Sequence, residues 1–232
     1  HRIHTKCCPV PIALTFLTQL VMLKKKLRYT VVPTLPEKRP EWLLENHNGQ
    51  LPALHNRDGT TLVGSLAIAE YLEEKHPHIS LSREGTYTYQ KVLDKTRGFF
   101  PALTAFILNK EPAQEETLRE EMYAQLDLLD RLLRSTPGRY TSGIEITLAD
   151  LYLAPQLFHA VVTMDKFKHD EILNFSGDPV RPGLETFMTL MFGMKEFNDK
   201  KAYYNMDQVI YGWRVARGEA RTGPKKTDED NL

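Results

Sequence analysis

Short segments typical of strands and longer segments with apolar residues at helical spacing follow each other along residues 1–77. Residues 2–5 and 27–32 contain β-branched and aromatic side chains in short runs, which predicts two strands. Between them, the apolar positions of residues 9–23 recur at helical spacing. Residues 24–26 are all lysine, and cations are favoured at a helix C-terminus. We therefore expect a helix between the two strands, with the lysines as its solvated end.

A hairpin and a further helix follow in the same half. The apolar runs 51–55 and 60–63 flank Asn56-Arg57-Asp58-Gly59, which is a turn signal. Ser65 is placed as the N-cap of a helix that His76-Pro77 ends, and residues 40–45 favour a shorter helix. The predicted order is β-α-β-α-β-β-α, which is the order of a thioredoxin-like α/β domain.

From Tyr87 onward the pattern is helical throughout. Residues 87–109 form a long apolar segment that Pro101 should kink or split, and residues 115–133 carry one apolar stripe. Thr147 and Asp150 have the spacing of a capping-box variant ahead of residues 151–159, the expected central helix of a bundle. Residues 183–192 predict one more helix.

These patterns predict two domains and a tail. The α/β N-terminal thioredoxin-like domain is expected over residues 1–77 and an all-α C-terminal helical bundle over residues 86–216, with a linker between them. Residues 217–232 are polar and charged, so a mobile tail is expected there.

Composition narrows the function classes. The chain of 232 residues has 30 basic and 30 acidic residues, and no basic stripe points to nucleic acid. No apolar run reaches the length of a membrane span. The two cysteines are adjacent, so a disulfide framework is not expected and a reducing compartment suits the chain. The eight histidines show no metal-ligand spacing, so we expect no metal.

Cys8, in Cys8-Pro9-Val10-Pro11, is the leading candidate for chemistry. It stands at the start of the first predicted helix, where the positive end of the helix dipole stabilises a thiolate. Pro9 suits the first helical position, which needs no N–H. Pro11 occupies the place of a second cysteine, so an external thiol would have to resolve any oxidised Cys8. The alternative is that Cys8 is a small buried hydrophobic residue.

Four other positions suggest a ligand site. Pro52 precedes a strand, where a cis-proline would leave the backbone of Leu51 free for a ligand; an ordinary trans-proline is the alternative. Ser65 offers a hydroxyl and free helix N–H groups to a carboxylate, or is simply an N-cap. Arg39 can clamp a second carboxylate, unless it is only solvated. With Cys8, these positions describe a site for a small thiol peptide with a carboxylate at each end, such as glutathione.

Several sequence blocks resemble the glutathione transferase superfamily, and within it the glutathione-dependent dehydroascorbate reductases of plants and algae. The most specific block is Thr147–His159. The other blocks, which extend the resemblance to about residue 214, are Arg39–Leu44, Asn48–Leu54, Ser65–Pro77, Phe99–Pro101, Asn109–Pro112 and Val209–Trp213.

The resemblance implies a glutathione transferase fold and a role for each candidate. Cys8 matches the nucleophile, and Arg39 matches a basic residue that holds the glycine carboxylate of glutathione. The backbone of Leu51 is expected to pair with the cysteinyl part beside a cis-proline at Pro52. Ser65 matches the residue that receives the γ-glutamyl carboxylate.

The chain also departs from the family pattern. Gly64 stands where the family usually has an acidic residue, and Cys7 stands where it often has aspartate. Ile12-Ala13 replaces a common Gln-Arg pair. The loop after the first strand is shortened, which removes a lysine near the substrate. These departures concern substrate identity and catalytic rate more than the fold.

The resemblance implies reduction of dehydroascorbate to ascorbate through the single nucleophile Cys8. Glutathione would be the co-substrate and a small oxidised molecule the other partner, in a monomer of the chloroplast or cytosol. One alternative is a weakened or inactive subunit that docks into a larger assembly, with residues 217–232 as an attachment arm. A weaker one comes from the chloride intracellular channel proteins; Thr15, Thr18 and Gln19 in the first helix argue against spanning a membrane.

Overall fold

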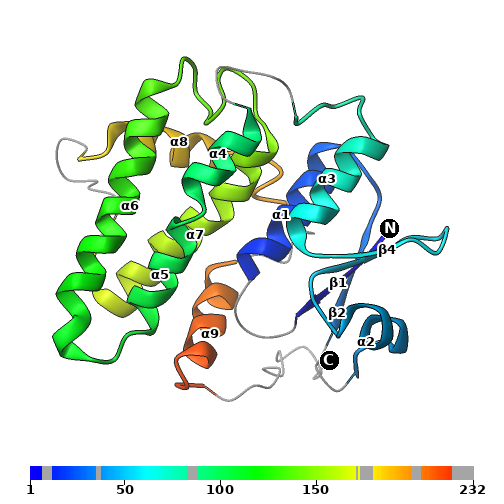
Figure 1. The fold of residues 1–232 in the computed structure, drawn as a ribbon, viewed down its shortest axis with the longest axis horizontal. Helices are drawn as coiled ribbons and strands as arrows, with labels where there is room; N and C mark the ends of the chain where they lie inside the picture. The colour runs from blue at the N-terminus through cyan, green and yellow to red at the C-terminus, as the bar shows by residue number, and fades with distance from the viewer. Residues whose placement is uncertain are drawn as a thin grey trace, which may run out of the picture.

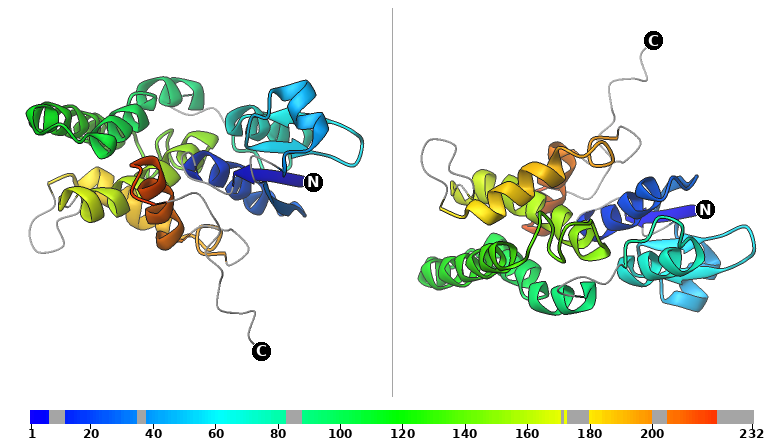
Figure 2. Two further views of the ribbon diagram at one scale, coloured as in Figure 1. Left: turned by 90° about the horizontal axis from the view of Figure 1, so that it is seen from below. Right: turned by 90° about the horizontal axis from the view of Figure 1, so that it is seen from above.

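The computed structural model describes residues 1–6, 12–34, 38–82, 88–170, 172, 180–199 and 205–220. A four-stranded sheet and its helices come first, and a group of helices follows (Figure 1). The views from below and above show these two parts at opposite ends of the molecule (Figure 2). The fold class is therefore the predicted one, an α/β part followed by a helical part. The predicted domain limits stay predictions.

The sheet has the strand order β2-β1-β3-β4. β1 (Arg2–Lys6) lies parallel to β2 (Thr30–Thr34) and antiparallel to β3 (Ala53–His55), which pairs with β4 (Thr61–Val63) as the predicted hairpin. His4 lies opposite Val32 on one side and Ala53 on the other. Side chains alternate between the two faces, so Arg2, His4 and His55 lie on one face and Ile3 and Leu54 on the other.

The two faces have separate cores. Ile3 and Leu54 belong to the main core, together with buried residues of α1 (Ile12–Lys24) and α3 (Ser65–Lys75). On the opposite face, Leu43 of α2 (Glu41–His47) packs with Leu51 and Ala53 in a small cluster of its own. The short helix α2 is therefore attached to the sheet independently of the main core.

Several element boundaries differ from the prediction, and the largest difference is at the central helix, expected over residues 151–159 and observed over Leu148–Lys168. β2 begins at Thr30 and not at residue 27, because the Leu27 N–H bonds back to the carbonyl of Met22 and completes the end of α1. Ser65 is the first residue of α3 and not its N-cap; Gly64 is the N-cap, with φ of +88°. None of these shifts changes the order of the elements.

The prediction that all three lysines at the end of α1 are solvated was wrong for Lys25. Its side chain is fully buried and lies 2.6 Å from a carboxylate oxygen of Glu73. Its Nζ also donates to the carbonyl oxygens of His76, at 2.7 Å, and Ile79, at 2.8 Å. Lys25 is buried because the fold surrounds its ammonium group with acceptors from α3 and the segment after it.

The helical part consists of α4 (Tyr89–Thr96), α5 (Phe99–Leu108), a 3₁₀ turn (Pro112–Gln114), α6 (Glu115–Ser135), α7 (Leu148–Lys168), α8 (Pro182–Phe192) and α9 (Met206–Ala216). Pro101 splits the first predicted helix, as expected, but the break lies before it at Arg97 and Gly98. A proline clashes with the carbonyl four residues earlier, which here belongs to Arg97.

Helix α7 is the centre of the helical part. It packs against α1 of the N-terminal part and against α4, α5, α8 and α9. The predicted capping box of Thr147 and Asp150 is present at its start. The Leu148 N–H there donates to the carbonyl of Leu81 at 2.8 Å, which ties α7 to the segment that leaves the α/β part. None of the described helices combines the length and apolar character needed to cross a membrane.

Candidate functional site

Four of the five predicted site residues lie in the part of the chain that the structure describes. These are Arg39, Leu51, Pro52 and Ser65. Cys8 lies outside the described residues, so its position relative to α1 stays a prediction.

The Leu51–Pro52 peptide bond is cis. The carbonyl of Pro52 accepts a hydrogen bond of 2.9 Å from the N–H of Gly64, which joins this turn to the start of α3. Leu51 is buried, and its backbone forms no hydrogen bond with the residues that the structure describes. Its N–H and C=O can therefore pair with an extended ligand, as a neighbouring strand would.

Ser65 opens α3 beside this turn. Its side chain is buried, and the first backbone bond of the helix runs from the Ile68 N–H to the Gly64 carbonyl. The three N–H groups of Ser65, Leu66 and Ala67 precede that bond and have no acceptor within the helix. With the dipole of an 11-residue helix behind them, they favour an anion at this end.

Arg39 lies on the other side of Leu51, packed over Gly49. A Cβ atom added at Gly49 would lie 2.8 Å from Nη1 and 3.1 Å from Cδ of Arg39, so a larger residue there would displace the guanidinium. Gly49 also has a φ of +70°, which glycine adopts without strain. The Nε of Arg39 is buried and has no hydrogen-bond partner among the described residues. An anion is the natural partner for such a donor.

The fold places Gln50 at the site, although the sequence pattern did not single it out. Its amide nitrogen would lie 3.9 Å from a Cβ atom at Gly64. Gln50 is an exposed loop residue, and only its place directly before Leu51-Pro52 could have drawn attention to it. It adds an uncharged donor and acceptor near the N-terminus of α3.

The structure thus brings together three features along one path: the guanidinium of Arg39, the open backbone of Leu51 and the N-terminus of α3. Arg39 packs over Gly49, which lies two residues before Leu51. The hydrogen bond from the Gly64 N–H to the Pro52 carbonyl connects the Leu51–Pro52 turn to the N-terminus of α3. This arrangement suits an extended ligand with a negative charge at each end. No cluster of histidine, cysteine, aspartate or glutamate among the described residues is arranged to hold a metal ion.

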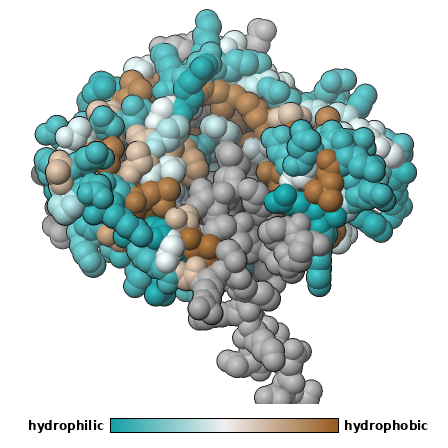
Figure 3. All heavy atoms as spheres, turned by 60° about the horizontal axis from the view of Figure 1, so that its bottom comes forward, coloured by the Kyte–Doolittle hydropathy of each residue, from teal (hydrophilic) through white to brown (hydrophobic). Residues whose placement is uncertain are grey.

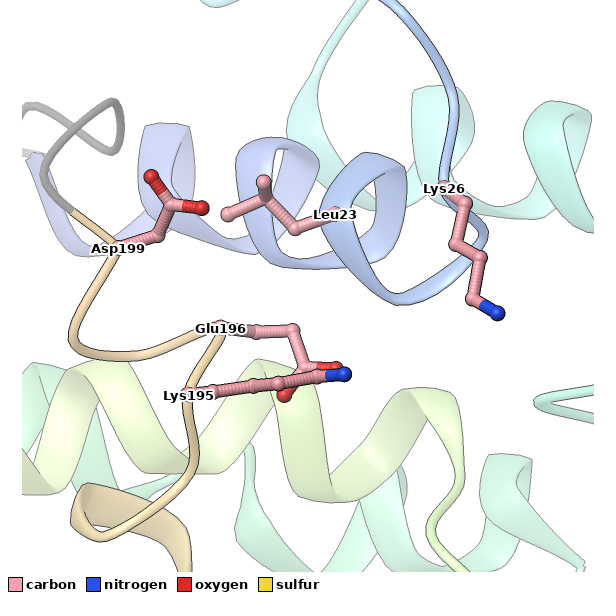
Figure 4. Close-up of a pocket in the computed structure, with 5 residues that line it drawn as sticks. All are labelled: Leu23, Lys26, Lys195, Glu196 and Asp199. Atoms are coloured by element: carbon pink, nitrogen blue, oxygen red, sulfur yellow. The ribbon is translucent and has the colours of Figure 1, made fainter.

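A separate surface pocket of about 270 Å³ lies beside the end of α1 and contains none of these residues. Its lining combines two lysines, two acidic residues and a leucine, namely Leu23, Lys26, Lys195, Glu196 and Asp199 (Figure 4). Glu196 lies 3.7 Å from Lys24, so part of its charge is already balanced. Hydrophobic side chains are scattered over a largely polar surface on both parts of the molecule (Figure 3).

Comparisons with known proteins agree with this geometry. Residues 17–82 match the family model described as "Glutathione S-transferase, N-terminal domain". Glutathione S-transferase DHAR2 of Arabidopsis thaliana is 27% identical over 197 residues, which cover 84% of each protein. The probable glutathione S-transferase DHAR1, cytosolic, of Oryza sativa subsp. japonica is 29% identical over 195 residues, again 84% of each.

A solved structure shows the same arrangement of elements. The crystal structure of Chlamydomonas reinhardtii dehydroascorbate reductase superposes with a TM-score of 0.75 at 25% sequence identity, covering 92% of this chain and 97% of that one. These similarities extend well beyond the matched N-terminal segment and include the helical part. The chain therefore has the glutathione transferase fold, and over 84% of its length its sequence is similar to that of proteins in the glutathione transferase superfamily.

Proposed function

We propose that this protein binds glutathione between Arg39 and the N-terminus of α3 and uses it to reduce dehydroascorbate through Cys8. The observation that carries the proposal is the buried Leu51, whose backbone forms no hydrogen bond with the described residues and lies between Arg39 and the N-terminus of α3. Arg39 would hold the glycine carboxylate, the backbone of Leu51 the cysteinyl part, and Ser65 the γ-glutamyl carboxylate. The similarity to plant and algal dehydroascorbate reductases supports the choice of substrate.

The proposed reaction transfers two electrons from two glutathione molecules to one dehydroascorbate. The Cys8 thiolate is oxidised to a sulfenic acid, with its oxygen taken from water, as dehydroascorbate is reduced to ascorbate. One glutathione condenses with the sulfenic acid, giving a mixed disulfide and water. A second glutathione attacks that disulfide, so glutathione disulfide leaves and the thiolate is restored.

Glutathione binding tests the ligand half of the proposal. Arg39→Leu should weaken binding about tenfold or more, because it removes a charge-assisted hydrogen bond to a carboxylate. Arg57→Leu is the matched control, since Arg57 is an exposed arginine in the turn of the hairpin. Calorimetric titration with glutathione measures both. Equal affinities in the two variants would refute the assignment of Arg39.

Activity assays test the proposed reaction at Cys8. Cys8→Ser should abolish the glutathione-dependent reduction of dehydroascorbate, while Cys7→Ser, the adjacent control, should retain it. Alkylation of Cys8 by iodoacetamide should continue well below the pH expected of a free cysteine. Activity retained in Cys8→Ser would rule out the mechanism.

One observation favours a second function, that of an inactive glutathione-transferase-like subunit docked into a larger assembly. Gly64 provides no carboxylate at the N-cap of α3, where the family pattern usually has one, and its φ of +88° suits glycine. This function predicts glutathione binding without turnover, and co-purification with a stoichiometric partner. The same two assays therefore separate the two functions.

A further inference from the structure

Three histidines surround Trp42, the tryptophan of helix α2. The ring centres of His4 on β1 and His55 on β3 lie 5.3 and 5.0 Å from that of Trp42. His47, near the end of α2, lies at 6.1 Å. Two of the three imidazoles thus come from the sheet and one from the helix itself. The proposed site does not use any of them.

Hydrogen bonds hold two of these rings in place. Nδ1 of His4 lies 3.3 Å from the hydroxyl of Thr34, which itself donates to the carbonyl of Val32. The hydroxyl is therefore an acceptor toward His4, and the proton of a neutral His4 is placed on Nδ1. Nε2 of His47 lies 2.9 Å from the hydroxyl of Thr61 on β4, which fastens the end of α2 to the edge of the sheet.

Little else fastens α2 to the sheet. Its buried residue Leu43 packs with Leu51 and Ala53 in the small cluster that is separate from the main core, and only Trp42 and Val63 of the described residues add partly buried apolar contacts to it. Yet both ends of α2 lead into the proposed ligand site: Arg39 precedes the helix, and Gly49 follows it with its N–H bonded to the carbonyl of Leu43. The position of α2 therefore sets the distance between Arg39 and Leu51.

Charged residues near the three histidines come from the sheet and from α2. Arg2 lies on the same face of the sheet as His4 and His55, while α2 contributes Glu41 and Glu45, both exposed. No carboxylate in the described ranges forms an ion pair with His4, His47 or His55. A proton on His4 would thus be buried beside Arg2 and next to a second imidazole.

We propose that helix α2 is a pH-sensitive flap of the ligand site, released when His4, which packs against Trp42, becomes protonated. The consequence for glutathione rests on the proposed function, because release of α2 separates Arg39 from Leu51. A proton on His4 would place a charge in a buried position next to Arg2 and His55, with no carboxylate among the described residues to balance it.

The direction of the pH effect follows from His4. Burial lowers the pKa of His4, and the charges of His55 and Arg2 lower it further. The attached state of α2 therefore excludes a proton that the released state accepts. Attachment is strongest above the ordinary histidine pKa of 6.5 and weakens as the pH falls below it.

Hydrogen exchange of the α2 backbone tests the flap without any ligand. After correction for intrinsic exchange, protection of residues 41–47 should fall several-fold from about pH 7.5 to about pH 5.5, because the released state accepts a proton that the attached state excludes. Protection of α3, which belongs to the main core, reports any loss of stability of the whole fold over the same interval, and the fall at α2 should exceed the fall at α3. Equal corrected protection of α2 at the two pH values would overturn the proposal.

Substitution of single histidines tests whether this group causes the loss of protection in α2. His4→Gln keeps a donor toward Thr34 and cannot be protonated, so the fall in protection should shrink to about twofold or less. His78→Gln, a change at an exposed histidine outside the group, should behave as the wild type. If His4→Gln does not fold, the same exchange measurement is made on His55→Gln, because the His55 side chain is half-buried in the same group. An unchanged fall in the deciding variant would overturn the proposal.

Glutathione affinity provides the functional readout. The dissociation constant for glutathione should rise several-fold over the same pH interval in the wild type and clearly less in His55→Gln. No glutathione binding at either pH would refute the proposed function, while the exchange of α2 would still decide whether the flap exists. A pH-independent affinity with a released α2 would overturn the link between the flap and the site.

Discussion

Lys25 and Glu73 form a buried ion pair of 2.6 Å that joins the end of α1 to α3. The second carboxylate oxygen of Glu73 accepts hydrogen bonds from the backbone and side chains of the segment after α3, namely from Ser80, Leu81 and Ser82. The carbonyl of Leu81 in turn accepts from Leu148 at the start of α7. A continuous set of buried polar contacts therefore runs from α1 to the central helix of the other part.

Removing one member of this pair should cost more than removing both. Lys25→Met leaves the Glu73 carboxylate without its counter-charge, and we expect the free energy of unfolding to fall by about 2–3 kcal/mol. The double variant Lys25→Met/Glu73→Gln should recover part of that loss, because it removes the buried charge and keeps an oxygen that accepts from Ser80, Leu81 and Ser82. Lys75→Met, at an exposed pair with Glu74, should cost less than about 1 kcal/mol. Urea denaturation measures all three, and equal losses for Lys25 and Lys75 would contradict the expectation.

Acid should weaken the same contact. Burial raises the pKa of Glu73, but the Lys25 ammonium and the Leu81 N–H outweigh burial and bring the pKa below its ordinary value of 4.5. Because the folded-state pKa is the lower one, the stabilisation is present above pH 4.5 and is lost as the pH falls through the folded-state pKa. Glu73→Gln should therefore be less stable at neutral pH yet lose less stability on acidification. Glu74→Gln, at an exposed side chain, should follow the wild type.

Sequence patterns predicted the features that depend on neighbouring residues. The capping box of Thr147 and Asp150 needs only a spacing of three residues, and the hairpin needs only a turn between two apolar runs. The cis bond at Pro52 was one of two alternatives for a proline before a strand, and the family resemblance implied it. Lys25 was wrongly predicted to be solvated, because the groups that it contacts lie about fifty residues further along the chain. The histidines around Trp42 were missed for the same reason, since three separate elements supply them.

Asp150 shows how much a predicted local motif can gain from tertiary contacts. One carboxylate oxygen accepts from the backbone and hydroxyl of Thr147, and the other accepts from those of Thr141, all within 2.9 Å. Asp150→Asn turns an NH₂ group toward two of these donors, and we expect a loss of about 2–4 kcal/mol. Thr141→Val removes one hydroxyl donor and should cost about 1 kcal/mol. Denaturant unfolding gives both values, and a neutral Asp150→Asn would contradict this account of the helix start.

Helix α9 should be released by acid through His159. Its Nδ1 accepts a hydrogen bond of 2.9 Å from the indole N–H of Trp213, and complete burial lowers the pKa of His159 to about 3. A neutral His159 therefore stabilises the fold fully above pH 6.5, and stability declines as the pH falls from 6.5 toward 3. His159→Gln should flatten this decline, whereas the exposed His78→Gln should not. Trp213 fluorescence against pH follows the release directly once Trp42→Phe has removed the other tryptophan.

Gly64 and Gly59 offer a matched pair that separates stability from binding. Both have a φ near +88°, and a Cβ atom would meet nothing within 4 Å at Gly59 and only the amide of Gln50, at 3.9 Å, at Gly64. Alanine should therefore strain both backbones alike, at a cost of about 1–2 kcal/mol. Only Gly64→Ala strains the turn that presents the N-terminus of α3, so it alone should weaken glutathione binding. If both variants lost stability equally and bound glutathione as the wild type does, the ligand would not rest on this end of α3.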